Sequence, residues 1–120
     1  MKDNIVKEKS FTFAVRVVRA YQVLSVERKE FVISKQFLRC GTSIGANIEE
    51  AIGAQSKADF ISKLSIAYKE ARETHYWIRL LKETGYLSES EANNLLCDVE
   101  ELLKIIARIK MTAIESINNS

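Results

Sequence analysis

The sequence predicts an all-α protein, an antiparallel up-down-up-down four-helix bundle formed by a single domain over residues 1–120. The chain contains no proline and only four glycines, whereas a β protein of this length needs turn residues at regular intervals. Apolar residues instead recur at steps of three and four along four segments, which is the spacing of amphipathic helices. The connections between these segments are short, and short connections place neighbouring helices antiparallel.

The first expected helix covers residues 10–26, and Ser10 is an acceptable N-cap. Its polar residues follow steps of three and four and therefore form one stripe. The stripe consists of Lys9, Thr12, Arg16, Arg19 and Gln22. The remainder of the helix is apolar, and such a helix is buried on two sides. Because a four-helix monomer covers only one side, we expect this helix to contribute a self-association surface.

The second expected helix, residues 29–54, passes through the unusual stretch RCGTSIGANIEEA. Apolar spacing continues across Gly41 and Gly45, and no lysine follows them in the position of a phosphate-binding loop. Glycine inside a helix costs about 0.5–1 kcal/mol relative to alanine. The glycines therefore predict a close approach, either of another helix axis or of a bulky side chain such as Trp77 or Tyr76.

Polar residues of the same segment follow steps of three, four, four and three, so they form one edge of the helix. We call them the polar strip: Gln36, Arg39, Ser43, Asn47 and Glu50. Two interpretations remain open. We favour a half-buried network that fixes the register between helices or subunits. The alternative is a strip that meets a ligand or RNA.

The third and fourth expected helices, residues 57–84 and 89–117, have clear start signals. Ser56 and Ser88 can each cap a helix, and each is followed three residues later by an acidic residue, as in a capping box. Gly85 is a natural residue just beyond a helix C-terminus.

No catalytic group, metal site or cofactor is predicted. The single histidine, His75, lies two residues after Glu73, so the Glu-x-x-His pairs of bundle di-metal sites are absent. No serine or cysteine has an evident base partner. Cys40 and Cys97 are isolated, as reduced thiols of cytoplasmic proteins are. No signal peptide and no apolar run of roughly 18 residues is present, so we expect a cytoplasmic protein without a membrane segment.

The net charge is only +2 but is unevenly distributed. Residues 1–28 and 57–86 are rich in bases, whereas residues 87–120 carry three bases and six acids. This distribution is compatible with a basic and an acidic side, or with ordinary solvated faces. The candidate nucleic-acid-binding residues are Lys9, Arg16 and Arg19, followed by Lys63, Arg72, Arg79 and Lys82.

The stretch HYWIRLLK interleaves aromatic and basic residues. Tyr76 and Trp77 in such a pattern can stack on nucleic-acid bases. Aromatic residues more often anchor a core or an interface, and we favour that interpretation here.

Two sequence blocks carry a family resemblance. The first, FVISKQFLRCGTSIGANIEEA, holds the polar strip together with Ile44 and Ile48, and the second, SKADFISKLSIAYKEARET, holds Phe60, Leu64, Ile66 and Ala67. Over these blocks the chain resembles the 23S rRNA intervening-sequence proteins, a four-helix-bundle family. That family is similar to the accessory proteins of diversity-generating retroelements, which are basic rings that work with a reverse transcriptase and its RNA.

The resemblance implies a bacterial bundle that assembles as a ring-shaped homo-oligomer, with a pentamer around a central channel as the expected form. It implies no settled activity. We therefore expect a non-enzymatic ring that binds structured RNA or another nucleic acid as a ribonucleoprotein accessory factor. The alternative is a protein-interaction scaffold whose partner docks on the ring without any nucleic acid.

Overall fold

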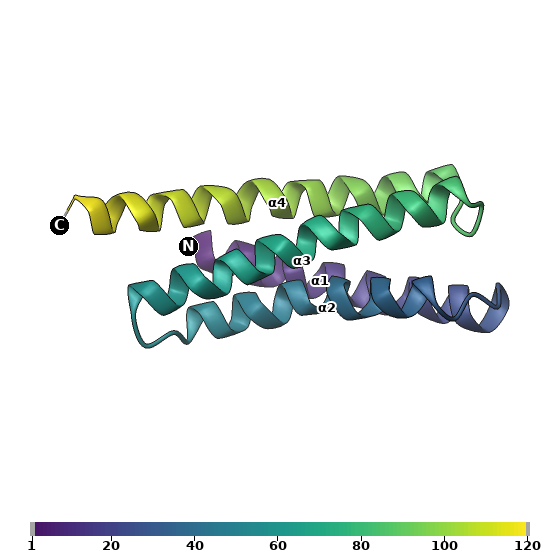
Figure 1. Cartoon of the computed structure of the whole chain (residues 1–120), viewed down its shortest axis with the longest axis horizontal. Coiled ribbons are helices and arrows are strands. Elements are labelled where there is room, and N and C mark those ends of the chain that lie inside the picture. Colours follow the sequence, from purple (N-terminus) through teal and green to yellow (C-terminus); the bar gives the residue numbers. More distant parts are fainter. Residues whose placement is uncertain (1, 120) are drawn as a thin grey trace.

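Four helices lie side by side in the computed structural model, which describes the backbone of residues 2–119 and the side chains of residues 5–119 (Figure 1). They are α1 (Lys2–Gln22), α2 (Ile33–Ile52), α3 (Lys57–Glu83) and α4 (Glu89–Asn118), and a π-helical turn, η1 (Val23–Glu27), extends α1. No strand occurs over residues 2–119, so the all-α, four-helix prediction is confirmed. Met1 and Ser120 of the expected domain lie outside the described residues.

Each helix packs against two others. α1 and α3 both contact α2 and α4, so α1 and α3 occupy diagonal corners of the bundle. Figure 1 shows the α1–α2 and α3–α4 connections at one end of the molecule and the α2–α3 connection at the other. The bundle measures 52 × 22 × 21 Å.

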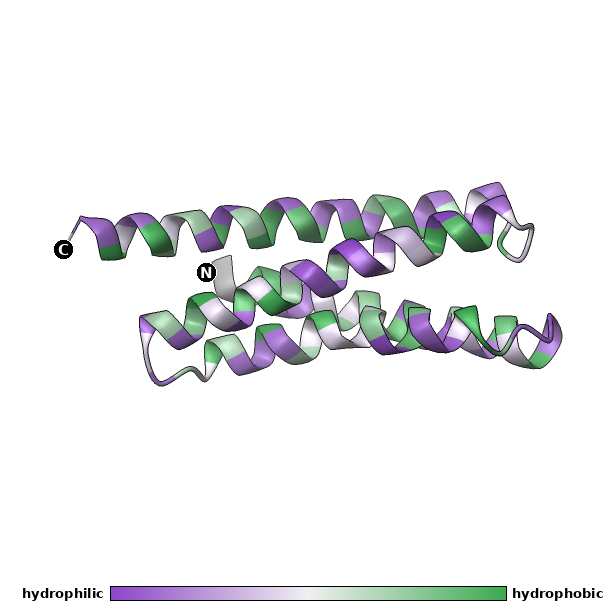
Figure 2. Ribbon diagram, in the orientation of Figure 1, coloured by the Kyte–Doolittle hydropathy of each residue, from purple (hydrophilic) through white to green (hydrophobic). Residues whose placement is uncertain are grey.

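The core lies along the bundle axis, and every helix contributes a stripe to it. Hydrophobic and hydrophilic residues alternate along each ribbon (Figure 2), as expected for helices that bury one face. The largest fully buried side chains include Phe13, Val17, Phe37, Ile44, Leu64, Ile78, Leu102 and Ile106. Among the side chains that the structure describes, no buried nitrogen or oxygen lacks a hydrogen-bond partner.

Gly41 and Gly45 allow α1 to approach α2 closely. A Cβ atom at Gly41 would lie 2.8 Å from both Cγ atoms of Val17, and one at Gly45 would lie 3.3 Å from the backbone oxygen of Ser10. The predicted close approach is therefore confirmed, and the element that approaches is α1 rather than the aromatic pair of α3.

The start of the first helix differs from the expected residue 10. α1 begins at Lys2, and Ser10 is a buried residue inside it, whose hydroxyl donates to the Lys7 backbone oxygen at 3.1 Å. No proline or glycine interrupts the first turns, and Val6 adds a further side chain to the core. The helix therefore continues through a residue that resembles a cap. At its other end, the α-helix gives way after Gln22 to η1, short of the expected residue 26.

The second helix also begins later than expected, at Ile33 instead of residue 29, and ends at Ile52 instead of residue 54. The N-cap residue is Val32, and the carboxylate of Glu30, two residues before it, accepts hydrogen bonds from the backbone N–H groups of Val32, Ile33 and Ser34. Burial raises the pKa of Glu30, but these hydrogen bonds outweigh burial and bring it below its ordinary value. Lys29 adopts a φ of 57°, which breaks the helical path before the cap.

The starts of α3 and α4 agree with the sequence signals. The Ser56 side chain accepts from the Asp59 N–H at 3.1 Å, and Ser88 and Glu91 form a reciprocal capping box. Both helices end within one residue of the expected positions, at Glu83 and Asn118.

Arg28 joins the end of η1 to the start of α4. Its guanidinium donates to both Glu91 carboxylate oxygens at 2.9 Å and to the Tyr86 backbone oxygen at 2.5 Å. The bonds from Arg28 and from the Ser88 backbone lower the pKa of Glu91 to about 2. This contact therefore connects two segments that lie far apart in the sequence.

We predict that Gly41→Ala destabilises the protein. Val17 is fully buried and stiff at χ1, so it cannot move away from the new methyl group. Overpacking of this kind costs about 1–3 kcal/mol, which exceeds the helix-propensity gain of about 1 kcal/mol. Thermal or denaturant unfolding measures the loss.

The matched control is Gly53→Ala, because a Cβ atom there meets only ordinary contacts at 3.9 Å. We expect that variant to change stability little. The double variant Gly41→Ala/Val17→Ala should lose less stability than the two single losses added together. A fully additive double variant would contradict the proposed contact.

We predict that Glu91→Gln weakens the pH dependence of folding. The folded pKa of Glu91, about 2, lies below the unfolded value of about 4.3. The ionised carboxylate thus stabilises the fold above the unfolded pKa, and this contribution is lost as the pH falls towards 2. Compared with wild type, the variant should be less stable at pH 7 and lose less stability between pH 5 and pH 2.5. Glu89→Gln, in the same helical turn, should retain the wild-type slope.

Candidate functional site

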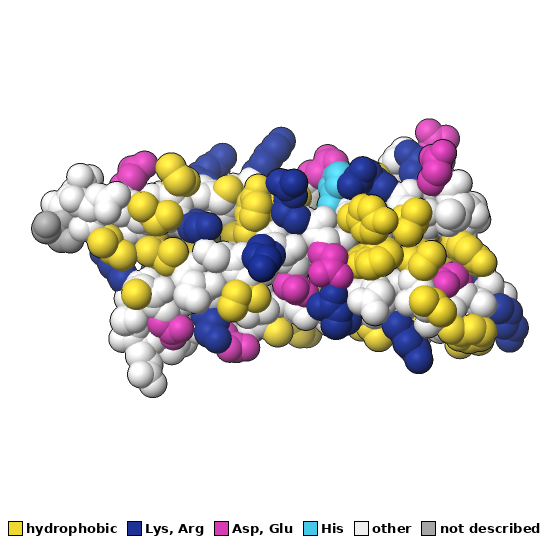
Figure 3. All heavy atoms as spheres, in the orientation of Figure 1, with side chains coloured by type: hydrophobic (Ala, Val, Ile, Leu, Met, Phe, Trp, Pro, Cys, Tyr) yellow, Lys and Arg dark blue, Asp and Glu magenta, His cyan; other side chains and the backbone are white. Residues whose placement is uncertain are grey.

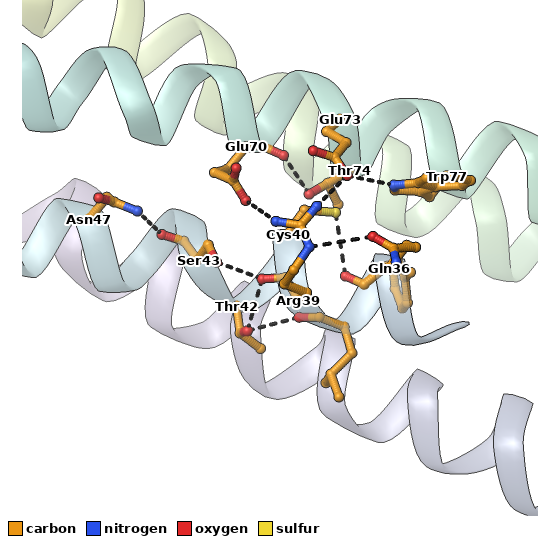
Figure 4. A network of polar contacts seen from close by, with 12 residues as sticks. Gln36, Arg39, Cys40, Thr42, Ser43, Asn47, Glu70, Glu73, Thr74 and Trp77 are labelled. Carbon is orange, nitrogen blue, oxygen red and sulfur yellow. Dashed lines mark hydrogen bonds and ion pairs between the residues drawn. The ribbon is translucent and has the colours of Figure 1, made fainter. Parts of the chain in front are cut away.

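The polar strip of α2 faces α3 (Figure 4). The Arg39 guanidinium donates to Glu70 at 3.1 Å and also bonds Glu73, and its Nε donates to Gln36 at 3.4 Å. Glu73 additionally accepts from the indole N–H of Trp77 at 3.0 Å. One arginine of α2 therefore connects two carboxylates that lie one turn apart on α3.

The remaining members of the polar strip are also partnered. The Ser43 hydroxyl donates to the Arg39 backbone oxygen at 2.6 Å, and the Asn47 amide donates to the Ser43 backbone oxygen at 2.8 Å. Glu50 pairs with Lys63 of α3 at 2.9 Å. Since two ion-paired positions join α2 to α3, the geometry favours a network that holds these two helices in register.

The contacts of this network shift the pKa values of Glu73 and of the neighbouring Cys40. The Trp77 hydrogen bond, opposed by burial and helped by Arg39, lowers the pKa of Glu73. Burial raises the pKa of the neighbouring Cys40 thiol to about 11, so the thiol stays protonated at neutral pH. Over the residues that the structure describes, no group of three or more His, Cys, Asp or Glu side chains could hold a metal ion.

The leading basic candidates of α1 contact the acidic side of α4. Lys9 pairs with Glu101 at 3.2 Å, and Arg16 pairs with Asp98 at 2.5 Å. Two bases of the first segment thus offset two acids of the last segment across the α1–α4 seam, so these groups do not form a separate basic side and acidic side. Arg19, the third candidate, is exposed and has no polar partner among the described side chains.

The basic candidates of α3 differ in their surroundings. Lys63 forms an ion pair with Glu50. The Lys82 ammonium donates to the Asn93 side chain at 3.0 Å, and Arg79 Nε donates to His75 at 3.2 Å. Arg72 is exposed, and the described residues offer it no polar partner.

Further exposed bases join Arg72 on the outer side of α3 and α4, and the sequence analysis did not select them. They are Lys69, Lys104 and Arg108, which form no ion pair with any described residue. Figure 3 shows Lys and Arg side chains gathered over the middle of these two helices. We call Lys69, Arg72, Lys104 and Arg108 the basic face. The spacing of Lys104 and Arg108, four residues apart and opposite the core stripe of α4, is the signal that could have found them.

α1 is apolar on its outer side as well as on its inner side. Phe11, Val15 and Val18 are 65%, 37% and 40% exposed, whereas Val17 is fully buried. These three residues, which we call the α1 outer face, line a shallow groove together with Ala14, Arg19 and Gln22. The two-sided apolar character expected of this helix is therefore present, with one side in the core and one side in solvent.

A second exposed apolar group lies at the end of the bundle that carries the α1–α2 connection. It comprises Val26, Phe31 and Val32, which are 66%, 54% and 75% exposed, and we call it the end patch. No helix of the described chain is long and apolar enough to cross a membrane.

Comparison with known proteins identifies the family. The sequence model described as 23S rRNA-intervening sequence protein matches residues 2–108, which include all of the polar strip and all of the basic face. The chain belongs to the 23S rRNA-intervening sequence protein family. No curated protein matches it.

A solved structure supports the same assignment. The present chain is similar to a protein of unknown function from the S23 ribosomal protein family of Bacteroides thetaiotaomicron VPI-5482, whose structure was determined by crystallography. The two chains are 55% identical, the match covers 92% of this chain and 99% of the other, and the TM-score is 0.91. The resemblance expected from the two sequence blocks is therefore confirmed.

Proposed function

We propose that this protein is a non-enzymatic, antiparallel up-down-up-down bundle that self-associates into a ring and binds RNA in the bacterial cytoplasm. The observation that carries the RNA-binding part is the basic face, whose four bases are exposed and unpaired in the described structure. Unpaired lysine and arginine side chains bind phosphates and release counterions, which is the main source of nucleic-acid affinity. The names of the family and of the similar S23 protein, both of which refer to ribosomal components, support the same proposal.

The self-association part rests on the α1 outer face. Phe11 is 65% exposed in the single chain. Burial of a large apolar side chain contributes about 1.5–3 kcal/mol, so a contact between copies that covers Phe11 favours association. Since α1 and α3 are diagonal, contacts through α1 leave the basic face of each copy accessible. A ring then repeats a modest basic patch several times, which converts weak phosphate contacts into avidity.

A protein-interaction scaffold is the alternative, and the end patch is the observation that favours it. Val26, Phe31 and Val32 expose apolar surface at a site away from α1, and such surface often marks a protein-binding site. A scaffold without a nucleic-acid ligand would bind no RNA even at low salt, whereas the end patch would remain essential for its partner.

We predict that Phe11→Ser/Val15→Ser converts the assembly to a monomer. Light scattering at micromolar concentration should give a multiple of the 13.7 kDa chain mass for wild type and the chain mass for the variant. Val32→Ser removes an apolar side chain that is more exposed than Phe11 or Val15 but belongs to the end patch, and it should leave the mass of the assembly unchanged. A monomeric wild-type protein would remove the ring proposal.

We predict that Lys104→Gln/Arg108→Gln weakens binding to structured RNA about tenfold or more at low salt, because phosphate contacts are lost in every subunit. Binding isotherms at two salt concentrations should also show a shallower salt dependence, by about 0.7–0.9 for each phosphate contact removed.

The matched control for charge is Lys29→Gln/Lys35→Gln, which removes two exposed, unpaired bases at the end of the bundle. We expect the control to bind RNA almost as wild type does. Equal loss in both double variants would assign the affinity to net charge, and absence of wild-type binding at low salt would remove the RNA proposal.

A further inference from the structure

A groove of about 550 Å³ lies between α3 and α4 beside the basic face. It is lined by Tyr68, Arg72, Glu73, His75, Tyr76 and Arg79 of α3 and by Leu103 of α4. Tyr68, Arg72, Tyr76 and Arg79 follow steps of four, four and three, so one side of α3 supplies nearly the whole lining. The volume falls within the range of about 300–1,000 Å³ that is typical of small-ligand sites.

The side chains that line this groove carry more positive than negative charge, because Arg72 and Arg79 accompany a single lining carboxylate, Glu73. Glu73 already binds Arg39 and Trp77. Arg72 has no polar partner among the described residues. The groove therefore offers a free guanidinium to an anion.

Arg79 supplies a second guanidinium, and hydrogen bonds through His75 to Glu100 hold its orientation. Its Nε donates to His75 Nδ1 at 3.2 Å, and the opposite ring nitrogen of His75 donates to Glu100. Among the described residues, Arg79 donates only through Nε, so its terminal nitrogens are available to a ligand. Arg72 and Arg79 lie seven residues apart, about two helical turns, and flank Tyr76 on the same side of α3.

Tyr76 provides an aromatic surface between these two cations. Its side chain is 48% exposed, the Arg79 guanidinium carbon lies 5.9 Å from the ring centre, and Trp77 meets the ring edge-on with centres 5.0 Å apart. Bases of single-stranded nucleic acid stack on tyrosine rings and on arginine guanidinium planes. The groove thus combines a site for a phosphate with a site for a planar base.

We propose that the α3–α4 groove binds one nucleotide unit, with its phosphate held by Arg72 and Arg79 and its base stacked against Tyr76. The same chemistry is presented by a free nucleoside monophosphate and by a nucleotide of single-stranded RNA. Only the RNA form rests on the proposed function.

Trp77, the only tryptophan of the chain, is an intrinsic reporter because it contacts Tyr76 directly. The experiment titrates the full-length protein at low salt with AMP, adenosine, inorganic phosphate and a five-nucleotide single-stranded RNA, and follows Trp77 fluorescence. We expect AMP to bind at least about tenfold more tightly than adenosine or phosphate alone, since each part contributes its own contacts.

Single-residue variants test the phosphate contact of Arg72 and the base-stacking contact of Tyr76 separately. Arg72→Gln should weaken AMP binding about tenfold, whereas Lys35→Gln, an equal charge change on α2 and outside both the groove and the basic face, should weaken it less than twofold. Tyr76→Leu should weaken binding about fivefold or more, and Tyr76→Phe should restore it because the stacking ring is retained. Circular dichroism confirms that each variant is folded.

Each outcome decides the assignment. Equal binding of phosphate and AMP, or equal losses in Arg72→Gln and Lys35→Gln, would overturn the nucleotide site. Absence of binding by both AMP and the short RNA would overturn it as well. AMP binding without affinity for the five-nucleotide or structured RNA retains the groove as a site for a free nucleotide and removes the RNA proposal. Binding of structured RNA without any binding in the groove removes the nucleotide site and retains the RNA proposal.

Discussion

The close packing of α1 on α2 is the constraint on which the rest of the molecule depends. Because Gly41 and Gly45 carry no side chain, Val17 and Ser10 of α1 pack directly against the α2 backbone. This contact fixes the rotation of α1, so that one side of the helix enters the core and the opposite side is directed to solvent. The apolar α1 outer face is therefore a consequence of a tight seam on the other side of the same helix.

The same rotation decides how charge is distributed over the surface. With Val17 buried, Lys9 and Arg16 are directed along α4 and pair with Glu101 and Asp98. The most basic segment of the sequence therefore has part of its charge offset by α4, whereas the four bases of the basic face, on α3 and α4, have no ion-pair partner among the described residues. A protein with a net charge of only +2 thereby presents a local surface that is suited to phosphate, without the high overall charge of a dedicated nucleic-acid-binding domain.

Local sequence signals were sufficient for much of the fold and for less of the site. Apolar spacing and the serine caps predict α3 and α4 to within one residue, because these signals act within a single turn. Ser10 was misleading, since the competing gain comes from the core contact of Val6 several residues earlier. The α3–α4 groove joins Leu103 to residues of another helix, and a single sequence does not reveal which helix faces meet. The polar strip was visible because its members share one helix edge.

The order of packing has a consequence for synthesis. Contacts between α1 and α2, α2 and α3, and α3 and α4 join sequence neighbours, and only the α1–α4 seam joins the two ends of the chain. While α4 is still within the ribosome, the nascent three-helix segment exposes the apolar surface that Val99, Leu102 and Ile106 later cover. Because chains fold from the N-terminus as they emerge, α4, the last of these four helices to be made, completes their core, and the incomplete bundle is the species most in need of a chaperone.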